Sequence, residues 1–222
     1  MKFRRKSKKK SSGLESLVNR GLMEATKPIF ENINKLMAYY RCAIMEVETK
    51  LNVLNEQFSL QYDRNPISSI QTRLKRMDSI SEKLAKDDLP MTLQSMEENL
   101  NDIAGVRVIC SFPEDVYMIA EALLSQDDIT LISKKDYIRE PKTNGYRSLH
   151  LIVTVPIFLA DEKRLMKVEI QLRTIAMDSW ASLEHQLRYK KEFEFTDQMA
   201  DELYRCAQIS AELDARMDNL RS

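Results

Sequence analysis

The segment from Leu165 to Arg173 constrains the fold more than any other part of this chain. From Lys167 onward its side chains alternate between an apolar face and a polar face. The apolar face carries Val168, Ile170 and Leu172, and the polar face carries Lys167, Glu169, Gln171 and Arg173. An alternation of period two is typical of a β-strand that buries one face. An antiparallel strand exposed on one side would show the same pattern without any function, so both interpretations stay open.

Three more segments favour strands of the same sheet. They are Val106–Phe112, Ile129–Ser133 and Leu149–Val155, all short and apolar. In the first of them Arg107 points away from an apolar face that is made by Val106, Val108, Cys110 and Phe112. A site on a sheet requires one apolar face and one face bearing charges of both signs. We therefore expect the polar face of this sheet to carry the chemistry.

Helical patterns surround the strands. From Ile29 to Gln61 the apolar residues recur at alternating steps of three and four, which describes one face of a long helix. Pro113 favours the first turn of a helix that reaches about Ser125. Further helices are expected over Ile67–Lys86, after Thr92, over Thr174–Tyr189 and over Asp197–Leu220. This order predicts an α+β fold, a small mixed β-sheet flanked by helices, with helical N- and C-terminal extensions.

Charge divides the chain into unequal parts. Residues 1–10 carry seven Lys or Arg and no acid, which leaves 27 basic against 34 acidic residues in the rest of the chain. Such a tail could touch RNA or an anionic membrane, although we prefer to interpret it as disordered and solubilising. The acidic body argues against a broad nucleic-acid surface, so an anionic substrate would need a local basic pocket. We expect a tail over 1–13, an N-terminal helical region over 14–64, a catalytic domain over 65–191 and a C-terminal helix over 192–222.

The sequence shows neither a membrane span nor a zinc motif. Its apolar runs are too short to cross a bilayer, and no apolar stretch follows the basic N-terminus. Three cysteines without a C-x-x-C pair and only two histidines do not make a Cys/His zinc site. These features predict a cytoplasmic protein that has no membrane partner.

Two acidic residues are candidates for a common metal site. Asp102 precedes the first predicted strand of the sheet, and Glu169 lies on the polar face of another. Two carboxylates on neighbouring elements can hold Mg²⁺, which prefers one or two of them together with substrate phosphate oxygens. Asp102 could equally be a cap or turn residue before its strand.

A row of basic and hydroxyl side chains follows the predicted helix Ile67–Lys86. Lys75, Ser79 and Lys83 are spaced by four and would share one helix face, and Arg73 and Arg76 lie nearby. Such a row can neutralise a triphosphate. A solvated basic surface with no ligand would have the same composition.

The segment from Lys142 to His150 combines turn chemistry with an aromatic ring. Asn144-Gly145 favours a tight turn before the strand that starts at Leu149. Tyr146 is flanked by Lys142, Arg147 and His150. An aromatic ring among basic residues commonly holds an unpaired nucleotide base and its phosphates, while a plain hairpin could use the same Asn-Gly pair.

These segments together resemble the signature blocks of the (p)ppGpp synthetases of the RelA/SpoT-homologue family. Asn101–Arg107, Asn144–His150 and Glu169–Thr174 are similar to three of the blocks, and Thr72–Lys75 and Trp180–His185 match two more. Five blocks in the family order, over about Asn65 to Lys190, make the resemblance specific. The short chain resembles the small alarmone synthetases, and Ile175–Asp178 favours the RelP-like over the RelQ-like type.

The resemblance implies an activity and a role for each matching residue. The protein would transfer pyrophosphate from ATP to the 3′-hydroxyl of GDP or GTP, making ppGpp or pppGpp and AMP. ATP would be held by Arg73, Lys75, Ser79, Lys83 and Arg107. Asp102 and Glu169 would be the catalytic residues that hold Mg²⁺, with Glu169 also activating the hydroxyl. The acceptor would be lined by Lys142, Tyr146, His150, Gln171, Arg173 and Asp178.

The resemblance also bears on assembly and regulation. Related small synthetases form homotetramers through terminal helices, and both terminal stripes of this chain could serve that purpose. Some relatives are activated by their product, but Pro66–Gln71 lacks the aromatic residue that we would expect at such a site.

Asp178 has a physical rationale of its own. Guanine offers two donors on one edge, N1–H and the 2-amino group, and a carboxylate can accept both, whereas adenine would leave a polar group unpaired. Asp178 could also be an ordinary acid in the first turn of a helix.

Two alternative functions remain open at this stage. One is pyrophosphate transfer to the 3′ end of tRNA, as in some toxic members of the family. The other is a catalytically inactive regulator that binds nucleotide or RNA.

Overall fold

The structure, a computed structural model, describes residues 8–62, 64–189 and 195–221. The chain forms two compact units, Met1–Ala38 and Tyr39–Ser222. The described part of the first unit is helical and belongs to α1, which runs from Lys8 to Tyr62.

α1 begins earlier than the sequence indicated. We expected a tail over residues 1–13 and a long helix from about Ile29, but the helix starts at Lys8 and passes through the Ser11-Ser12-Gly13 segment. One glycine in a helix interior costs only about 1 kcal/mol relative to alanine, so residues of higher helix propensity on both sides can carry the helix across it. The rest of the expected basic tail, residues 1–7, lies outside the described residues.

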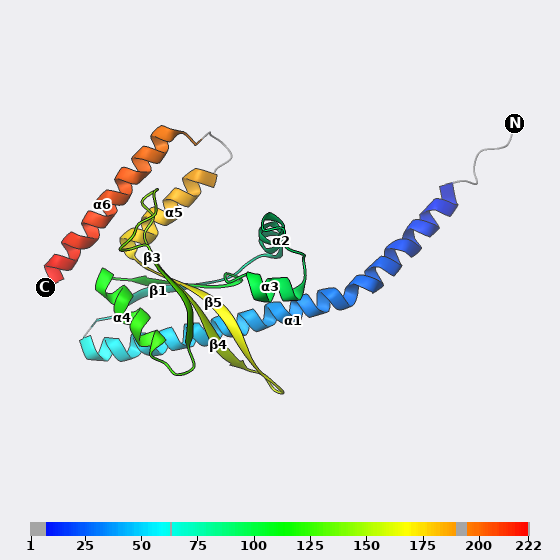
Figure 1. Cartoon of the computed structure of the whole chain (residues 1–222), viewed down its shortest axis with the longest axis horizontal. Coiled ribbons are helices and arrows are strands. Elements are labelled where there is room, and N and C mark those ends of the chain that lie inside the picture. The colour runs from blue at the N-terminus through cyan, green and yellow to red at the C-terminus, as the bar shows by residue number, and fades with distance from the viewer. Residues whose placement is uncertain (1–7, 63, 190–194, 222) are drawn as a thin grey trace. The chain divides into compact units, whose positions relative to one another are not determined.

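A mixed sheet forms the centre of the second unit, as predicted, but it has five strands where the sequence indicated four (Figure 1). The strands are β1 (Ile67–Leu74), β2 (Ala104–Cys110), β3 (Thr130–Asp136), β4 (Leu149–Phe158) and β5 (Lys163–Thr174). Their order across the sheet is β1-β2-β5-β4-β3. β2 and β5 are parallel, and the other neighbouring pairs are antiparallel.

Five further helices accompany the sheet in the described part of this unit. They are α2 (Met77–Lys86), α3 (Leu93–Asn99), α4 (Pro113–Leu124), α5 (Ile175–Tyr189) and α6 (Asp197–Arg221). α3 follows Thr92, whose side chain accepts a hydrogen bond from the backbone N–H of Ser95 as an N-cap. Proline opens α4 as expected, and α5 and α6 match the predicted helices to within one residue at each end.

The prediction of one helix over Ile67–Lys86 is wrong. Ile67–Leu74 is the edge strand β1, which pairs with β2, and only the later part of the segment is helical. Ile67, Ile70 and Leu74 are spaced by three and four, which imitates a helical stripe. Of these three residues only Ile67 is buried, and both faces of the edge strand are largely exposed. The strand therefore lacks the alternation of apolar and polar side chains that identifies a half-buried strand.

The apolar face of the sheet carries the core. Val168, Ile170 and Leu172 of β5 are fully buried, as their alternation predicted. β2 and β4 add buried residues on the same side, and α4 packs on β2 and β5 through Val116, Ile119 and Leu123. Burying a side chain of this size stabilises the fold by about 1.5–3 kcal/mol, so this face holds the strands firmly in register.

The register aligns polar residues across the opposite face. Gln71 pairs with Arg107, Arg107 with Gln171, and Gln171 with His150, so one row crosses four strands. Two residues along, Arg73, Gly105 and Glu169 form a second row on the same face. Residues far apart in the sequence therefore meet on one rigid surface.

Candidate active site

A cavity of about 520 Å³ opens above the polar rows of β1, β2 and β5. It is lined by Gln71, Thr72, Arg73, Asp102, Gly105, Val106, Arg107, Glu169 and Gln171. The two candidate carboxylates thus border one cavity, together with two of the arginines that the resemblance assigned to ATP. Each comes from a strand of the sheet or from the turn just before β2, so the sheet fixes their spacing.

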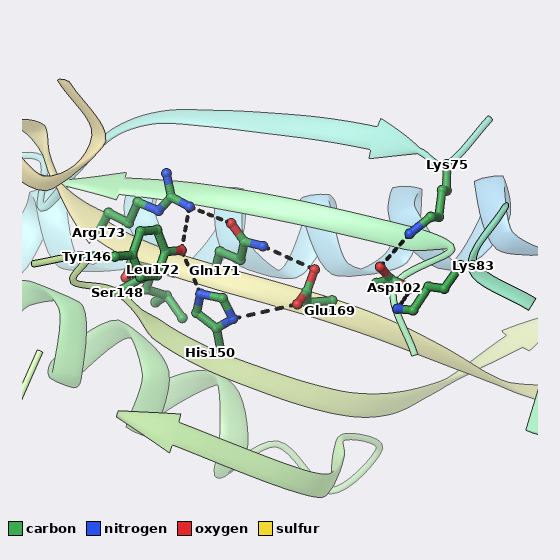
Figure 2. Close-up of polar contacts among 10 residues, drawn as sticks. All are labelled: Lys75, Lys83, Asp102, Tyr146, Ser148, His150, Glu169, Gln171, Leu172 and Arg173. Atoms are coloured by element: carbon green, nitrogen blue, oxygen red, sulfur yellow. Dashed lines mark hydrogen bonds and ion pairs between the residues drawn. The ribbon is translucent and has the colours of Figure 1, made fainter. Parts of the chain in front are cut away.

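Asp102 is held by two lysines (Figure 2). Lys75 donates to Oδ2 at 2.7 Å, and Lys83 donates to Oδ1 at 2.8 Å. Burial alone would raise the pKa of Asp102, but the hydrogen bonds and charges of these lysines hold that pKa below its ordinary value. The carboxylate is therefore ionised at neutral pH, in a strongly cationic setting.

The prediction that Lys75 and Lys83 share one helix face is wrong. Lys75 lies between β1 and α2, where its backbone N–H donates to the carbonyl of Ile103, whereas Lys83 lies in the last turn of α2. Both nevertheless converge on Asp102. Ser79 lies on α2 one turn before Lys83, half-buried, and is not among the residues that line the cavity.

Glu169 contacts two polar neighbours on the sheet. Nε2 of Gln171 donates to Oε2 of Glu169 at 3.1 Å, and Nδ1 of His150 lies 3.6 Å from Oε1. Burial alone would raise the pKa of Glu169, but His150 and Gln171 hold it below its ordinary value. Glu169 is thus an ionised carboxylate, 21% exposed, that can accept hydrogen bonds or bind a cation.

A hydrogen-bonded network joins Glu169 to Tyr146. Arg173 donates to the hydroxyl of Tyr146 at 2.6 Å and to Oε1 of Gln171 at 2.8 Å. The same hydroxyl lies 2.8 Å from Nε2 of His150. In the tautomer in which this hydroxyl donates to Nε2, the proton of the neutral imidazole lies on Nδ1, which faces Glu169.

The segment Lys142–Tyr146 is here called the acceptor loop, because the resemblance assigns Lys142 and Tyr146 to the acceptor nucleotide. It places a cation over two aromatic rings. Nζ of Lys142 lies 4.7 Å from the ring centroid of Tyr137 and 5.0 Å from that of Tyr146. The two rings are 6.1 Å apart in an edge-to-face arrangement. Tyr137, just after β3, escaped the sequence analysis because it lies in none of the signature blocks. Its only sequence signal was an aromatic residue four positions after the predicted strand Ile129–Ser133.

Asp178 lies between two arginines. Its Oδ1 is 3.2 Å from Arg173 and 3.4 Å from Arg107. Arg173 is nearly buried, while Arg107 is 35% exposed and also borders the cavity. Burial lowers the pKa of Arg107, and the charge of Arg173 acts in the same direction, whereas Asp178 opposes both. Sequence patterns gave no sign of these partners, which come from β2 and β5.

The donor set suits a divalent cation that is shared with a substrate. The described residues contain no group of three or more His, Cys, Asp or Glu that could form a complete protein cage. Asp102 and Glu169 border the same cavity, and the charge of Asp102 acts on Glu169. Mg²⁺ is commonly bound by one or two carboxylates plus phosphate oxygens, so the residues present fit this ion.

Comparison with known proteins identifies the family. The model for the "Region found in RelA / SpoT proteins" matches residues 72–194, which include every residue of the cavity except Gln71. The chain belongs to the RelA/SpoT family. The described residues contain no helix that is both long and apolar enough to span a membrane.

Relatives of known name cover most of the chain. The GTP pyrophosphokinase YwaC of Bacillus subtilis is 40% identical over 88% of this chain and 93% of its own. YjbM, a second GTP pyrophosphokinase of B. subtilis, is 34% identical over 84% of this chain and 87% of its own. The crystal structure of small alarmone synthetase 1 from B. subtilis, bound to its product pppGpp, matches with a TM-score of 0.78, 34% identity and coverage of 86% of this chain and 97% of that one. The chain is thus similar to small alarmone synthetases, and its RelP-like subtype stays a prediction.

Proposed function

We propose that this RelA/SpoT-family chain is a GTP pyrophosphokinase that transfers a pyrophosphoryl group from ATP to the 3′-hydroxyl of GDP or GTP. The products would be ppGpp or pppGpp, and AMP. One observation carries the proposal: Glu169 borders the cavity with Asp102 and also contacts the network that reaches Tyr146 (Figure 2). A carboxylate between two binding regions suits a reaction between two nucleotides.

The cavity would take ATP. Arg73 and Arg107 border it and are suited to stack on the adenine, while Lys75, Ser79 and Lys83 would face the phosphates. The two lysines now neutralise Asp102, and a triphosphate offers them stronger anionic partners. Their transfer to the phosphates would release the Asp102 carboxylate for a cation.

Asp102 and Glu169 would hold Mg²⁺. The ion would neutralise charge on the phosphate oxygens and so favour attack by an oxygen nucleophile. Lys75 and Lys83 would add positive charge on the same side.

The acceptor nucleotide would bind beside Tyr146. Its guanine would stack on the Tyr146 ring and present N1–H and the 2-amino group to Asp178. Lys142, His150, Gln171 and Arg173 would line the ribose and phosphates. Glu169 would accept the proton of the 3′-hydroxyl as that oxygen bonds to the β-phosphorus of ATP. The bond from the β-phosphorus to the bridging α–β oxygen would break, and AMP would leave.

The protein would act in the cytoplasm as a homotetramer. The α1 stripe that the sequence offered for assembly is instead buried within the chain from Tyr40 to Phe58. Other apolar residues of the terminal helices are at least half exposed: Met45, Val53 and Leu60 of α1, and Ile209, Leu213 and Met217 of α6. Apolar rows of this kind on terminal helices suit contacts between copies of one chain. Light scattering of the purified protein measures the mass directly, and a monomer at micromolar concentration would contradict the assembly.

The test of the function uses γ-³²P-labelled ATP and Mg²⁺ with GDP, GTP or deacylated tRNA as the acceptor. We expect label in ppGpp or pppGpp together with AMP, and none when EDTA replaces Mg²⁺. Label in tRNA alone would assign the chain to RNA modification instead. Label in no acceptor, with a folded protein that binds nucleotide, would indicate a regulator without catalytic activity.

A further inference from the structure

Gly145 in the acceptor loop lies directly against α6. Its φ of +88° is unfavourable for residues other than glycine, and a Cβ added there would lie 2.5 Å from the Cβ of Ala207. The same added atom would lie 3.3 Å from the ring of Tyr204. The loop backbone therefore touches the helix at a place where neither partner has room for another atom.

Tyr146 packs against a cluster that includes the same part of α6. The buried residues of this cluster are Trp180 and Ala181 from α5 and Ala207 from α6. Nε1 of Trp180 donates to the backbone carbonyl of Leu203 at 2.8 Å, which fixes α5 and α6 against each other. The two helices thus form the support on which Tyr146 packs.

A second contact ties α6 to the start of α5. The hydroxyl of Thr174 donates to Asp214 at 2.7 Å and accepts a hydrogen bond from the backbone N–H of Met177 at 3.1 Å. Thr174 and Asp214 are both buried. Thr174 comes directly after Arg173 and one turn before Asp178, so α6 also fixes the part of α5 that carries the guanine-facing carboxylate.

The acceptor loop is closed by its own hydrogen bonds, which couple the positions of its residues. Gly145 N–H donates to the carbonyl of Lys142 at 2.8 Å, and Lys142 N–H donates to the carbonyl of Tyr146 at 3.1 Å. A displacement of Gly145 is therefore passed on to Tyr146 and Lys142. A misplacement of about 1 Å at a site can cost on the order of 100-fold in rate.

We propose that α6 is a positioning element of the acceptor subsite and that Ala207 is the residue through which it sets the place of Tyr146. α6 begins at Asp197, after the last residue that the family model matches, so the proposed subsite includes an element outside the matched region. The proposal rests on the proposed function, because it takes Tyr146 to meet a guanine nucleotide. Ala207 touches no substrate and acts through the loop.

Ala207→Leu in the full-length protein tests the proposal, with Ala215→Leu as the matched control on an exposed position of the same helix. The measurements are KM for GDP, KM for ATP, kcat and the thermal midpoint. We expect KM for GDP to rise roughly tenfold or more in Ala207→Leu, while KM for ATP stays within about twofold, because only the acceptor loop is displaced. The control should behave as wild type. An unchanged KM for GDP, or equal changes in both KM values with a lowered midpoint, would overturn the positioning role.

A compensating pair separates this contact from general damage. Gly145→Ala adds the Cβ that collides with Ala207, and Ala207→Gly removes the atom with which it collides. The double variant should recover part of the GDP affinity that Gly145→Ala loses, with the backbone strain at φ +88° remaining. No recovery would show that the contact is not what positions the loop.

Direct binding distinguishes failure of this proposal from failure of the proposed function. Titration with a fluorescent GDP analogue measures acceptor affinity whether or not transfer occurs. Wild type that binds the analogue but transfers nothing would overturn the proposed reaction, and a weaker Kd in Ala207→Leu would still support the role of α6. Equal Kd values in wild type and Ala207→Leu, or no binding by wild type, would overturn the positioning proposal.

Discussion

The hydroxyl of Tyr146 lies 2.8 Å from Nε2 of His150. This contact joins the acceptor loop to β4, and through the other ring nitrogen of His150 it reaches Glu169 at 3.6 Å. Tyr146 would therefore have two separable roles. Its ring offers a stacking surface, and its hydroxyl fixes the imidazole that faces the proposed base.

Substitution at Tyr146 separates these roles. Tyr146→Phe keeps the ring but removes the hydroxyl that Arg173 and His150 share, so kcat should fall roughly tenfold, a hydrogen bond to a charged group being worth about 1.5–3 kcal/mol. Tyr146→Ala also removes the stacking surface and should raise KM for the acceptor about 10- to 100-fold, since base stacking on an aromatic ring is worth about 1–3 kcal/mol. Steady-state kinetics with GDP varied decides this, and an unchanged acceptor KM in Tyr146→Ala would remove the ring from that role.

Glu169→Gln should abolish most of the transfer without unfolding the protein. The amide keeps the shape of the side chain but cannot take the 3′-hydroxyl proton, and general-base catalysis contributes about 10²- to 10⁴-fold. The rate of AMP release at saturating substrates measures the loss. Glu98→Gln, at an exposed position outside the cavity, is the control and should turn over normally. Wild-type kcat in Glu169→Gln would exclude Glu169 as the base.

Asp102→Asn should change the dependence on Mg²⁺. The variant keeps a carbonyl oxygen in place but loses the negative charge that suits a divalent cation, so half-maximal activity should require more Mg²⁺ as well as a lower kcat. A titration of activity against Mg²⁺ at fixed ATP measures the shift. An identical Mg²⁺ requirement in the variant and wild type would assign Asp102 to holding Lys75 and Lys83 alone.

The helices and strands that could be predicted from the sequence are those that bury one face, because their apolar residues then recur with the period of the element. β5 buries one face, so its alternation was plain, whereas β1 is an exposed edge strand whose apolar spacing imitates a helix. Most of the candidate residues came from the five signature blocks, but which of them contact one another could not be read from these blocks. The two lysines on Asp102 and the arginines beside Asp178 depend on how β1, β2 and β5 come together with α2 and α5, which no local pattern encodes.

Asp115 makes a separate prediction about stability. It is fully buried at the start of α4, accepts two hydrogen bonds from Arg64 at 2.8 and 2.6 Å, and accepts one from the backbone N–H of Phe112 at 3.2 Å. Asp115→Ala leaves these donors without that acceptor and should lower the free energy of unfolding by about 2–4 kcal/mol, because removing one partner of a buried pair is costly. Urea unfolding of wild type and Asp115→Ala measures this loss. Asp128→Ala, which breaks the more exposed pair with Lys50, should cost no more than about 1 kcal/mol. Equal losses in the two variants would contradict this account.

Asp214, which accepts a hydrogen bond from the hydroxyl of Thr174, should make the free energy of unfolding depend on pH. Burial raises its pKa above the ordinary value of 3.8, and the hydrogen bond from Thr174 and the charge of Arg147 only partly oppose this. The folded state therefore binds the proton more tightly than the unfolded state, so the stabilisation is complete below the ordinary pKa and is lost as the pH rises through the folded pKa. Asp214→Asn keeps an oxygen for Thr174 but carries no charge. Its free energy of unfolding relative to wild type should increase from about pH 3.5 upward and then level off, as the group finishes ionising in the folded wild-type protein. Urea unfolding of both proteins at a series of pH values measures the difference. A difference that is constant with pH would contradict the raised pKa, and one that decreases would show that the charge stabilises the contact between α5 and α6.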